Sequence, residues 1–417
     1  NITFTGNLVT GAADYGLDAI AGSATVTNNT FEANGDGAGQ SAGVRFFSAG
    51  HTVQFNEILN NVGPGIIVAG EMVATPRPRG EAVISQNEFS GNAGLAVDVQ
   101  AASESNSLNG DGVTANDGGT TATSGNLALD FPVITAADYS GGTTTVVGAA
   151  CDGCTIEIYR ANAGAGDAGH GEGVLFLGSG TATGGSFSIA VTGVSPAAEV
   201  SATATDTVLA VTSEFAANFV VNGPPTANDD SYSGVSEGGT LNVPATGVLG
   251  NDTDDGLPSG TLSAVLETTT SHGSLTLNAD GSFQYVHDDS ENLSDSFTYR
   301  TSDGNVSSTP ATVTINITGV NDTAPVANGD AYGGVSEGGT LNVPAVTGVL
   351  DNDTDADVPP DTLQAQLVAT TSYGSLTLNA DGSFDYTHDG SENLSESFTY
   401  NAFDGVNTSA VAATVTI

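Results

Sequence analysis

The sequence predicts an all-β chain in which a parallel β-helix is followed by three β-sandwiches. Thr, Val, Ala and Ser fill short stretches between turns, and Gly accounts for 56 of the 417 residues. This composition is typical of short strands joined by tight turns. A short motif recurs through the first hundred residues, and a unit of about a hundred residues occurs twice near the end. Repeats on these two scales indicate a solenoid and an array of separate modules.

The β-helix is predicted over residues 1–130. The motifs ITFTGN, NTFEAN, NEILNN and NEFSGN recur at steps of 27, 27 and 31 residues, and a strand of the pattern Gly-apolar-x-apolar follows each. Coils of a parallel β-helix stack at about 4.8 Å, so aligned apolar residues fill the bore and aligned amides form ladders. The alignment predicts an apolar line of Phe4, Phe31, Ile58 and Phe89 and a ladder of Asn7, Asn34, Asn61 and Asn92. The polar stretch from 100 to 130 is expected to cap the solenoid.

An immunoglobulin-like β-sandwich is predicted over residues 131–222, where about seven short strands alternate with regular turn signals. Cys151 and Cys154 flank Asp-Gly between two of these strands. A redox CxxC motif would open a helix after a strand, and two thiolates without nearby His or further Cys make a poor zinc site. We therefore expect a structural disulfide between Cys151 and Cys154, formed in an oxidising exterior.

The hundred-residue unit occupies residues 223–322 (repeat 1) and 323–417 (repeat 2). Each copy contains SLTLNADGSF, which predicts a β-hairpin with Gly281 or Gly382 at the turn. Carboxylates cluster at corresponding places in the two copies: Asp230, Glu237, Asp252 and Asp254 in the first, and Asp330, Glu337, Asp353 and Asp355 in the second. Several carboxylates held together need a counter-charge, and Ca²⁺ accepts six to eight oxygens in flexible geometry. Calcium is therefore the expected cofactor; the alternative is that these residues serve turns and solubility.

The charge of the chain restricts its partners and its surroundings. Acidic residues number 48 and basic residues 5, for a formal net charge of -43. Nucleic acid is excluded because phosphate binding needs the opposite sign. Such self-repulsion must be screened by salt or by bound cations, which fits a secreted or cell-surface protein. No apolar run is long enough to insert in a membrane. Because the chain opens with Asn and not Met, we expect a piece of a longer protein.

The repeats resemble a known family. PPTANDDSYSGVSEGGTLNV, HGSLTLNADGSFQYVH and ATVTINITGVNDTAP resemble the bacterial cadherin-like and VCBS-type tandem repeats of large secreted adhesins and surface proteins, over about 195 residues. NEFSGNAGLAVDV and LALDFPVITAA are similar to secreted bacterial right-handed β-helix proteins that carry an Ig-like domain after the solenoid. The resemblance implies a right-handed parallel β-helix followed by three Ig-like or cadherin-like sandwiches.

Cadherin-type modules bind calcium where one domain meets the next, so the resemblance also implies ligands. The residues it implicates are Asn321 and Asp322 of VNDTAP, Glu337 of SEGG, and Asp353 and Asp355 of NDTD. Repeat 2 has Gly329 where repeat 1 has Asp229, and Ala356 where repeat 1 has Asp255. We therefore expect different ligand sets at the two junctions.

The rival interpretation is an enzyme, since parallel β-helices often act on polysaccharides. Glu57 and Glu88 occupy the same position on adjacent coils, with Glu32 two places further along its own coil. Two carboxylates about 5 Å apart would suit a retaining glycosidase. Against it, the second strand position after the recurrent Gly holds Asp18, Arg45, Ile67 and Ala96, which makes no acidic groove. We predict a non-catalytic structural or adhesive protein, with a polysaccharide-binding or polysaccharide-cleaving β-helix as the alternative.

The expected partners are neighbouring copies of the chain or other surface and matrix components, with polysaccharide as the alternative. The strand that precedes Phe31, Ile58 and Phe89 has no equivalent before Phe4 in the motif alignment. An open first coil would expose backbone edges that template strand addition. Either further coils precede it, or another chain covers it, and a head-to-tail contact of that kind can build a filament.

Overall fold

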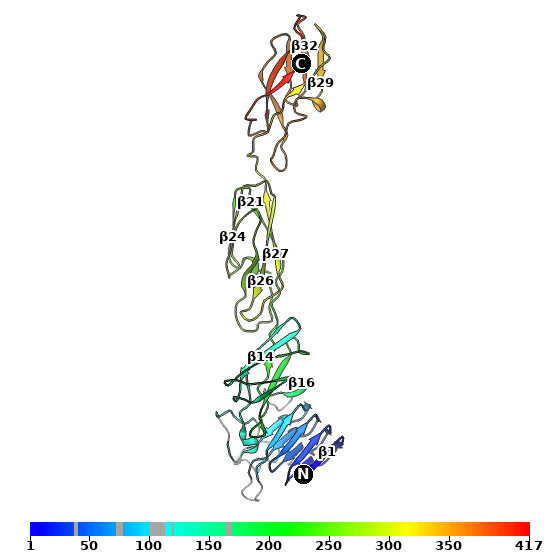
Figure 1. Ribbon diagram of the computed structural model, residues 1–417, viewed down its shortest axis with the longest axis vertical. Coiled ribbons are helices and arrows are strands. Elements are labelled where there is room, and N and C mark those ends of the chain that lie inside the picture. The colour runs from blue at the N-terminus through cyan, green and yellow to red at the C-terminus, as the bar shows by residue number, and fades with distance from the viewer. Residues whose placement is uncertain (37–40, 72–77, 101–112, 119–120, 123, 163–168) are drawn as a thin grey trace. The chain divides into compact units, whose positions relative to one another are not determined.

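The computed structural model describes residues 1–36, 41–71, 78–100, 113–118, 121–122, 124–162 and 169–417 (Figure 1). These residues form strands and three short 3-10 helices. They divide into two compact units: residues 1–225 together with 253–261 and 302–307, and the rest of the two repeats. No helix in the described parts of the chain is long and apolar enough to cross a bilayer.

The first hundred residues form a parallel β-helix whose coils each contribute one strand to each of three sheets. The first sheet contains β1 (Ile2–Thr5), β4 (Ala24–Thr27), β7 (His51–Gln54) and β10 (Ala82–Ser85). The second contains β2 (Leu8–Thr10), β5 (Thr30–Glu32), β8 (Glu57–Leu59) and β11 (Glu88–Ser90). The third contains β3 (Tyr15–Ala19), β6 (Ala42–Phe46), β9 (Ile66–Val68) and β12 (Val97–Val99). The predicted solenoid is confirmed.

Apolar side chains fill the bore, and two ladders of Asn, all buried except Asn7, run along the turns. Phe31, Ile58 and Phe89 are at most 1 % exposed. In each ladder the main-chain and side-chain amides of one Asn donate to the Oδ1 atom of the Asn on the next coil. One ladder joins Asn7, Asn29, Asn56 and Asn87, and the other joins Asn34, Asn61 and Asn92.

The first coil has a different register from the one that the motifs predict. β1 pairs with β4, so Phe4 lies beside Val26 and not beside Phe31. Asn7 likewise joins Asn29, at a step of 22 residues. The motif alignment was wrong here because a Thr-Phe-polar strand fits the first and the second strand of a coil equally well. The strand that we expected to be missing is β1 itself, and the first coil has all three strands.

The immunoglobulin-like sandwich follows a short 3-10 helix, η2 (Gly125–Ala128). One sheet has the order β13-β14-β17; the other has β16-β15-β18-β19, with β20 also on β18. The strands are β13 (Val133–Ser140), β14 (Thr143–Ala149), β15 (Thr155–Asn162), β16 (Glu172–Thr181), β17 (Ser186–Val191), β18 (Glu199–Asp206), β19 (Val211–Thr212) and β20 (Phe219–Val220). Residues 101–112 of the predicted cap lie outside the described residues.

Three buried glutamates of this sandwich meet the three strands of the last coil. Glu157 accepts the hydroxyl of Ser85 at the end of β10, Glu172 accepts both amides of Asn92 after β11, and Glu214 accepts the Val99 amide of β12. Each glutamate is at most 3 % exposed. Burial raises the pKa of Glu172 against these hydrogen bonds. Glu172 Oε1 thus accepts the pair of N–H groups that an Asn of a further coil would accept.

Each repeat is a sandwich of a four-stranded and a three-stranded sheet. Repeat 1 contains β21 (Asp230–Ser236), β22 (Thr240–Val243), η3 (Gly247–Leu249), β23 (Ser263–Thr268), β24 (Gly273–Leu277), β25 (Phe283–His287), β26 (Ser294–Ser302) and β27 (Ala311–Thr318). Repeat 2 contains β28 (Asp330–Ala331), β29 (Thr340–Val343), η4 (Ala345–Thr347), β30 (Gln364–Ala369), β31 (Ser375–Leu378), β32 (Phe384–Thr387), β33 (Ser397–Phe403) and β34 (Ala413–Thr416).

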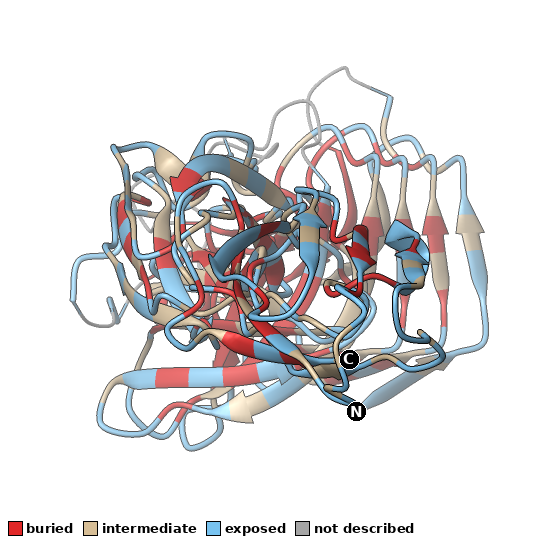
Figure 2. Ribbon diagram, turned by 90° about the horizontal axis from the view of Figure 1, so that it is seen from above, coloured by how far each residue is buried: buried red, intermediate tan, exposed pale blue. Residues whose placement is uncertain are grey.

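The cores of the two repeats use the same aromatic residues, and buried and exposed residues alternate along the strands (Figure 2). The anchors are Phe283, Tyr285, Phe297 and Tyr299 in repeat 1, and Phe384, Tyr386, Phe398 and Tyr400 in repeat 2. The expected hairpins are β24–β25 and β31–β32. Gly281 and Gly382 have φ of 81° and 83°, the left-handed conformation that these turns need.

Candidate metal centre

Carboxylates from both repeats and from the linker between them converge within the second unit. Glu291 lies between β25 and β26 of repeat 1, and Asp322 lies in the linker, the segment between β27 and β28. Asp355 and Asp357 lie in the loop before β30, and Asp404 follows β33. Their oxygens form two groups, Glu291 with Asp322 and Asp357, and Asp355 with Asp357 and Asp404. Within each group one oxygen per residue lies within 4.8 Å of the others, and Asp357 belongs to both.

Main-chain amides hold one oxygen of several of these carboxylates in place. The Thr323 amide of the linker donates to Asp357 Oδ1 at 3.0 Å. The Val320 amide donates to Glu237 Oε2 at 2.6 Å, which brings the end of β21 to the same linker. The linker therefore positions acidic side chains from both repeats.

The remaining oxygens of this centre are buried and accept no hydrogen bond from the described residues. They are Glu237 Oε1, Asn321 Oδ1, Asp355 Oδ2, Asp357 Oδ2 and Asp404 Oδ2. A buried acceptor without a donor costs about 1 to 3 kcal/mol, and native structures contain few of them. Burial, together with the charges of Asp357 and Asp404, raises the pKa of Asp355. Five unpaired oxygens in an acidic environment fit a hard divalent cation, because the ligands of such an ion are oxygens.

The structure brings some of the sequence-derived ligands to this centre and adds others. Glu237, Asn321, Asp322 and Asp355 lie there. Sequence reasoning missed Glu291, Asp357 and Asp404. Two of these had a signal: Asp357 continues the alternating acidic pattern of NDTDAD, and Asp404 stands in the Asp-Gly pair that follows the SFTY segment in both copies.

Asp230, Asp252, Asp330 and Asp353 lie elsewhere, around a buried tyrosine hydroxyl in each repeat. In repeat 1 the Tyr299 hydroxyl is 2.6 Å from Val248 O, 3.1 Å from Asp252 and 3.3 Å from Asp230. A phenol has one proton to donate, so these acceptors compete for it. Burial raises the pKa of Asp230, and likewise of Asp330 beside Tyr400, to about 6.

The last two sequence-derived ligands, Asp254 and Glu337, lie away from this centre. Asp254 is part of the loop 253–261, which belongs to the first unit. Glu337 lines a small pocket of repeat 2 together with His388 and Glu396. Neither lies among the two carboxylate groups found in the described residues.

The first junction, between the immunoglobulin-like sandwich and the loops 253–261 and 302–307, lies within the first unit. The Asn222 side-chain amide donates to Asp138 at 2.9 Å and to Asp303 at 3.2 Å. Asn305 donates to Asp138 at 3.1 Å. Asn222 is 4 % exposed. Here side-chain amides donate hydrogen bonds to the carboxylates.

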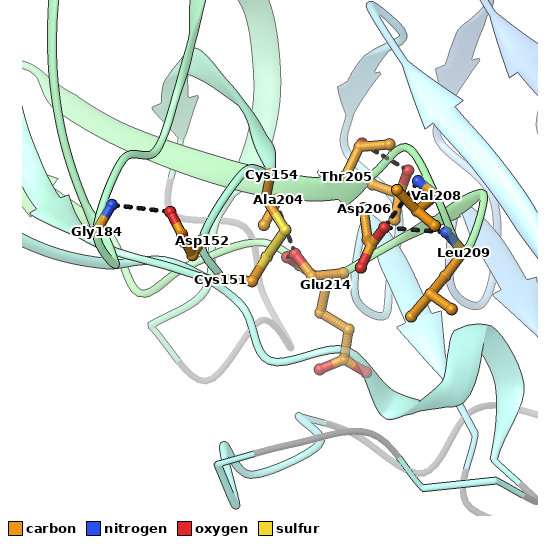
Figure 3. Close-up of a disulfide and its surroundings, with 12 residues drawn as sticks. Cys151, Asp152, Cys154, Gly184, Ala204, Thr205, Asp206, Val208, Leu209 and Glu214 are labelled. Atoms are coloured by element: carbon orange, nitrogen blue, oxygen red, sulfur yellow. Dashed lines mark hydrogen bonds between the residues drawn. A yellow bond between two sulfur atoms is a disulfide. The ribbon is translucent and has the colours of Figure 1, made fainter.

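Cys151 and Cys154 form a disulfide in the turn between β14 and β15, with their Cα atoms 5.5 Å apart (Figure 3). Asp152, inside the same turn, accepts the Gly184 amide at 2.8 Å. The described residues contain no free cysteine. The bridge thus fastens a tight turn that connects the two sheets of the sandwich.

Glu57 and Glu88, the residues of the enzymatic interpretation, lie side by side on the second sheet of the solenoid. β8 and β11 pair in register at these two residues, while Glu32 pairs with Leu59. On the third sheet, Asp98 and not Ala96 lies beside Ile67, because β12 begins later than the Gly alignment places it. No carboxylate group of metal-binding dimensions involves these residues in the described part of the chain.

Two family models match the chain. The model described as "Bacterial cadherin-like domain" matches residues 222–319 and 322–417, and the model described as "Right handed beta helix region" matches residues 1–131. No curated protein is similar to the chain.

Solved structures with a partial likeness include cadherin ectodomains and one hydrolase. The human Desmocollin-1 ectodomain is 10 % identical over 63 % of this chain and 54 % of its own, with a TM-score of 0.32. The Protocadherin GammaB4 extracellular domain is 13 % identical over 66 % and 46 %, with a TM-score of 0.33. An endo-fucoidan hydrolase of glycoside hydrolase family 107 is 16 % identical over 70 % and 44 %, with a TM-score of 0.22. The chain thus spans about half the length of the desmocollin structure. The family models thus identify two bacterial cadherin-like domains, which follow a right-handed β-helix region in this chain.

Proposed function

We propose that the chain is an extracellular, non-catalytic structural or adhesive protein in which Ca²⁺ bridges the two cadherin-like repeats. Cadherin-like domains support an adhesive or structural role outside the cell. The single observation that carries the calcium proposal is the set of five buried, unpaired oxygens at the repeat linker. Calcium tolerates irregular oxygen geometry, whereas zinc favours His and Cys, which are not among these residues.

The electrostatics of the linker give the ion a structural task. Two carboxylates about 4 Å apart repel by about 1 kcal/mol in water and about 4 kcal/mol at an effective dielectric of 20. Asp357 belongs to both carboxylate groups, so two ions that share it would be coupled. With calcium bound, repeat 1, the linker and repeat 2 would share ligands and be held together; without it, the same charges would push them apart.

The test is thermal unfolding and small-angle scattering of residues 1–417 with calcium or with a chelator. An ion bound only by the folded state stabilises by about 2.7 kcal/mol at a hundredfold excess over Kd. We expect calcium to raise the melting temperature of the repeats and to narrow the distribution of chain dimensions. Magnesium at equal ionic strength controls for charge screening. The same melting curve and scattering profile in calcium and in chelator would contradict the calcium bridge.

A polysaccharide-binding or polysaccharide-cleaving β-helix is the second candidate, because Glu57 and Glu88 stack on adjacent strands. The test is release of reducing ends from acidic and neutral polysaccharides by residues 1–417. Activity that disappears in the Glu57→Ala, Glu88→Ala double variant would support this candidate. Activity that survives in the double variant would exclude this pair as its source.

Self-association into fibres is a further part of the proposal. Electron microscopy of residues 1–417 tests it at several calcium concentrations. Filaments would support assembly by neighbouring copies, and isolated particles under every condition would contradict it for this chain.

A further inference from the structure

A cavity of about 420 Å³ lies in the first unit beside the disulfide. Leu129, Phe131, Ala150 and Cys151 form much of its apolar wall. Asp130 and Asp206 also line it. Its volume falls within the range of small-molecule sites, which combine apolar walls with a few placed polar groups.

Main-chain amides fix both carboxylates of this cavity. Asp130 accepts N–H groups from Asp117 at 3.1 Å and from Gly118 at 3.0 Å. Asp206 accepts two more, at 2.8 and 2.9 Å, from the turn that follows it (Figure 3). Hydrogen bonds of this kind hold each carboxylate in one place. The described lining contains no Arg or His.

The apolar wall has an aromatic member whose ring is held in position. Phe131 packs edge-on against His170, with ring centroids 4.9 Å apart. Its main-chain N–H and C=O groups are both bonded to the Asn116 side chain at 2.9 Å. A ring fixed in this way offers a preformed apolar surface, and aromatic faces also attract cations.

We propose that this cavity binds a small ligand that has an apolar ring or short chain and ends in an ammonium group. The apolar wall contacts the body of the ligand, and the two carboxylates that line the cavity, Asp130 and Asp206, balance its charge. An anionic ligand is disfavoured by the same two carboxylates. The site is separate from the linker between the repeats and does not depend on calcium.

The test uses three probes that share a phenyl ring and differ in charge: phenethylamine, phenethyl alcohol and phenylpropionate. Their binding to residues 1–417 is measured by ligand-observed NMR and calorimetry in a chelator. We expect the amine to bind most tightly and the carboxylate most weakly. Asp206→Asn keeps the oxygen that accepts the two turn amides and removes the charge. It should therefore lower the affinity for the amine about fivefold or more, as expected for one charge pair at about 4 Å. It should leave the alcohol unchanged.

Two further variants make the result decisive. Ala150→Trp fills the cavity and should abolish binding of all three probes. Asp152→Asn removes an equal charge from the neighbouring turn, where Asp152 does not line the cavity, and should change nothing. Absence of binding by all three probes overturns the proposal. The proposal is also overturned if phenylpropionate binds as tightly as the amine. The same holds if Asp152→Asn lowers the affinity for the amine as much as Asp206→Asn does.

Discussion

At the first junction, side-chain amides donate to the carboxylates; at the linker between the repeats, the Asn321 amide donates to the main-chain oxygen of Asp404 and not to its carboxylate. Asp303 and Asp404 follow the same strand in the two repeats. Asp303 Oδ2 accepts the Asn222 amide, whereas Asp404 Oδ2 is buried without a donor. The position of the donor Asn305 is taken by Val406 in repeat 2, since each donates its main-chain amide to the preceding Asp at 2.7 Å.

The comparison shows that corresponding carboxylate oxygens of the two repeats can be either hydrogen-bonded or left without a donor. At the first junction Asn222 and Asn305 donate to the carboxylates, and Asn222 Oδ1 is a buried oxygen that accepts no hydrogen bond from the described residues. At the repeat linker five oxygens stay without a donor, and the proposed function assigns them to calcium. The same chain would then have one joint that ignores calcium and one that responds to it.

The largest expected effect is that of Asn222→Asp at the first junction. The change removes the donor and adds a buried carboxylate beside Asp138 and Asp303, and an uncompensated buried charge costs about 3 to 5 kcal/mol. Calorimetry in a chelator should show the first unit melting at a lower temperature. Calcium should restore part of the loss, because the variant carries an all-carboxylate set.

Asn242→Asp adds the same charge at an exposed strand position and serves as the control. A variant at Asn222 that melts like the parent in chelator would break the comparison, because the amide would then not be needed.

Asp357→Asn should remove most of the calcium response of the repeats. Asp357 is common to both carboxylate groups, so its loss weakens both. The stabilisation of about 2.7 kcal/mol expected at a hundredfold calcium excess should fall towards zero. Titration calorimetry gives the affinity, and differential scanning calorimetry gives the stability.

Asp255→Asn is the matched control at the first junction. Asp255 accepts the Gly223 amide at 2.8 Å as Asp357 accepts the amide of Thr323. We expect this control to keep its calcium response. Equal losses in both variants would mean that the two junctions do not differ as described.

Val406→Asn copies the donor of the first junction into repeat 2. A hydrogen bond to a buried acceptor contributes about 1 kcal/mol, so the variant should be more stable than the parent in a chelator by about that amount. Its calcium affinity should fall. Asn305→Val is the reciprocal change and should destabilise the first unit equally with and without calcium. If Val406→Asn raised calcium affinity instead, the amide would be acting as an oxygen ligand.

The smallest expected effect is a pH dependence of the metal-free repeats. Burial raises the pKa of Asp230 and Asp330 to about 6, above the value of an unfolded Asp. The folded state therefore binds these protons more tightly, and stability in a chelator should rise as the pH falls from about 7 to about 4. A fully buried group with this shift would contribute about 3 kcal/mol; partial exposure reduces it well below that.

The Asp230→Asn, Asp330→Asn double variant should lose most of this pH dependence in thermal melts. A slope unchanged in the double variant would assign it to other carboxylates, such as Asp355, whose pKa burial also raises.

The sequence was sufficient for the fold and for much of the linker, and the failures have local causes. Periodic apolar residues and repeated Asn identified the solenoid, but a strand of alternating Thr and Phe cannot say which of three sheets it belongs to, so Phe4 was misplaced. In NDTD the first Asp turns inward to a tyrosine hydroxyl in both repeats, and the sequence does not reveal this. The contrast between the junctions depends on which way single amides point, which no spacing encodes.

The glutamate contact between Glu172 and Asn92 has a consequence for how the length of the solenoid can change. The sandwich meets only the final coil through this carboxylate, which takes the place of one more Asn. Deleting or duplicating a whole coil further upstream would therefore shorten or lengthen the solenoid by about 4.8 Å and leave this boundary unaltered. Among proteins that share this boundary, the number of coils can therefore vary by whole coils while the sandwich that ends the solenoid stays the same.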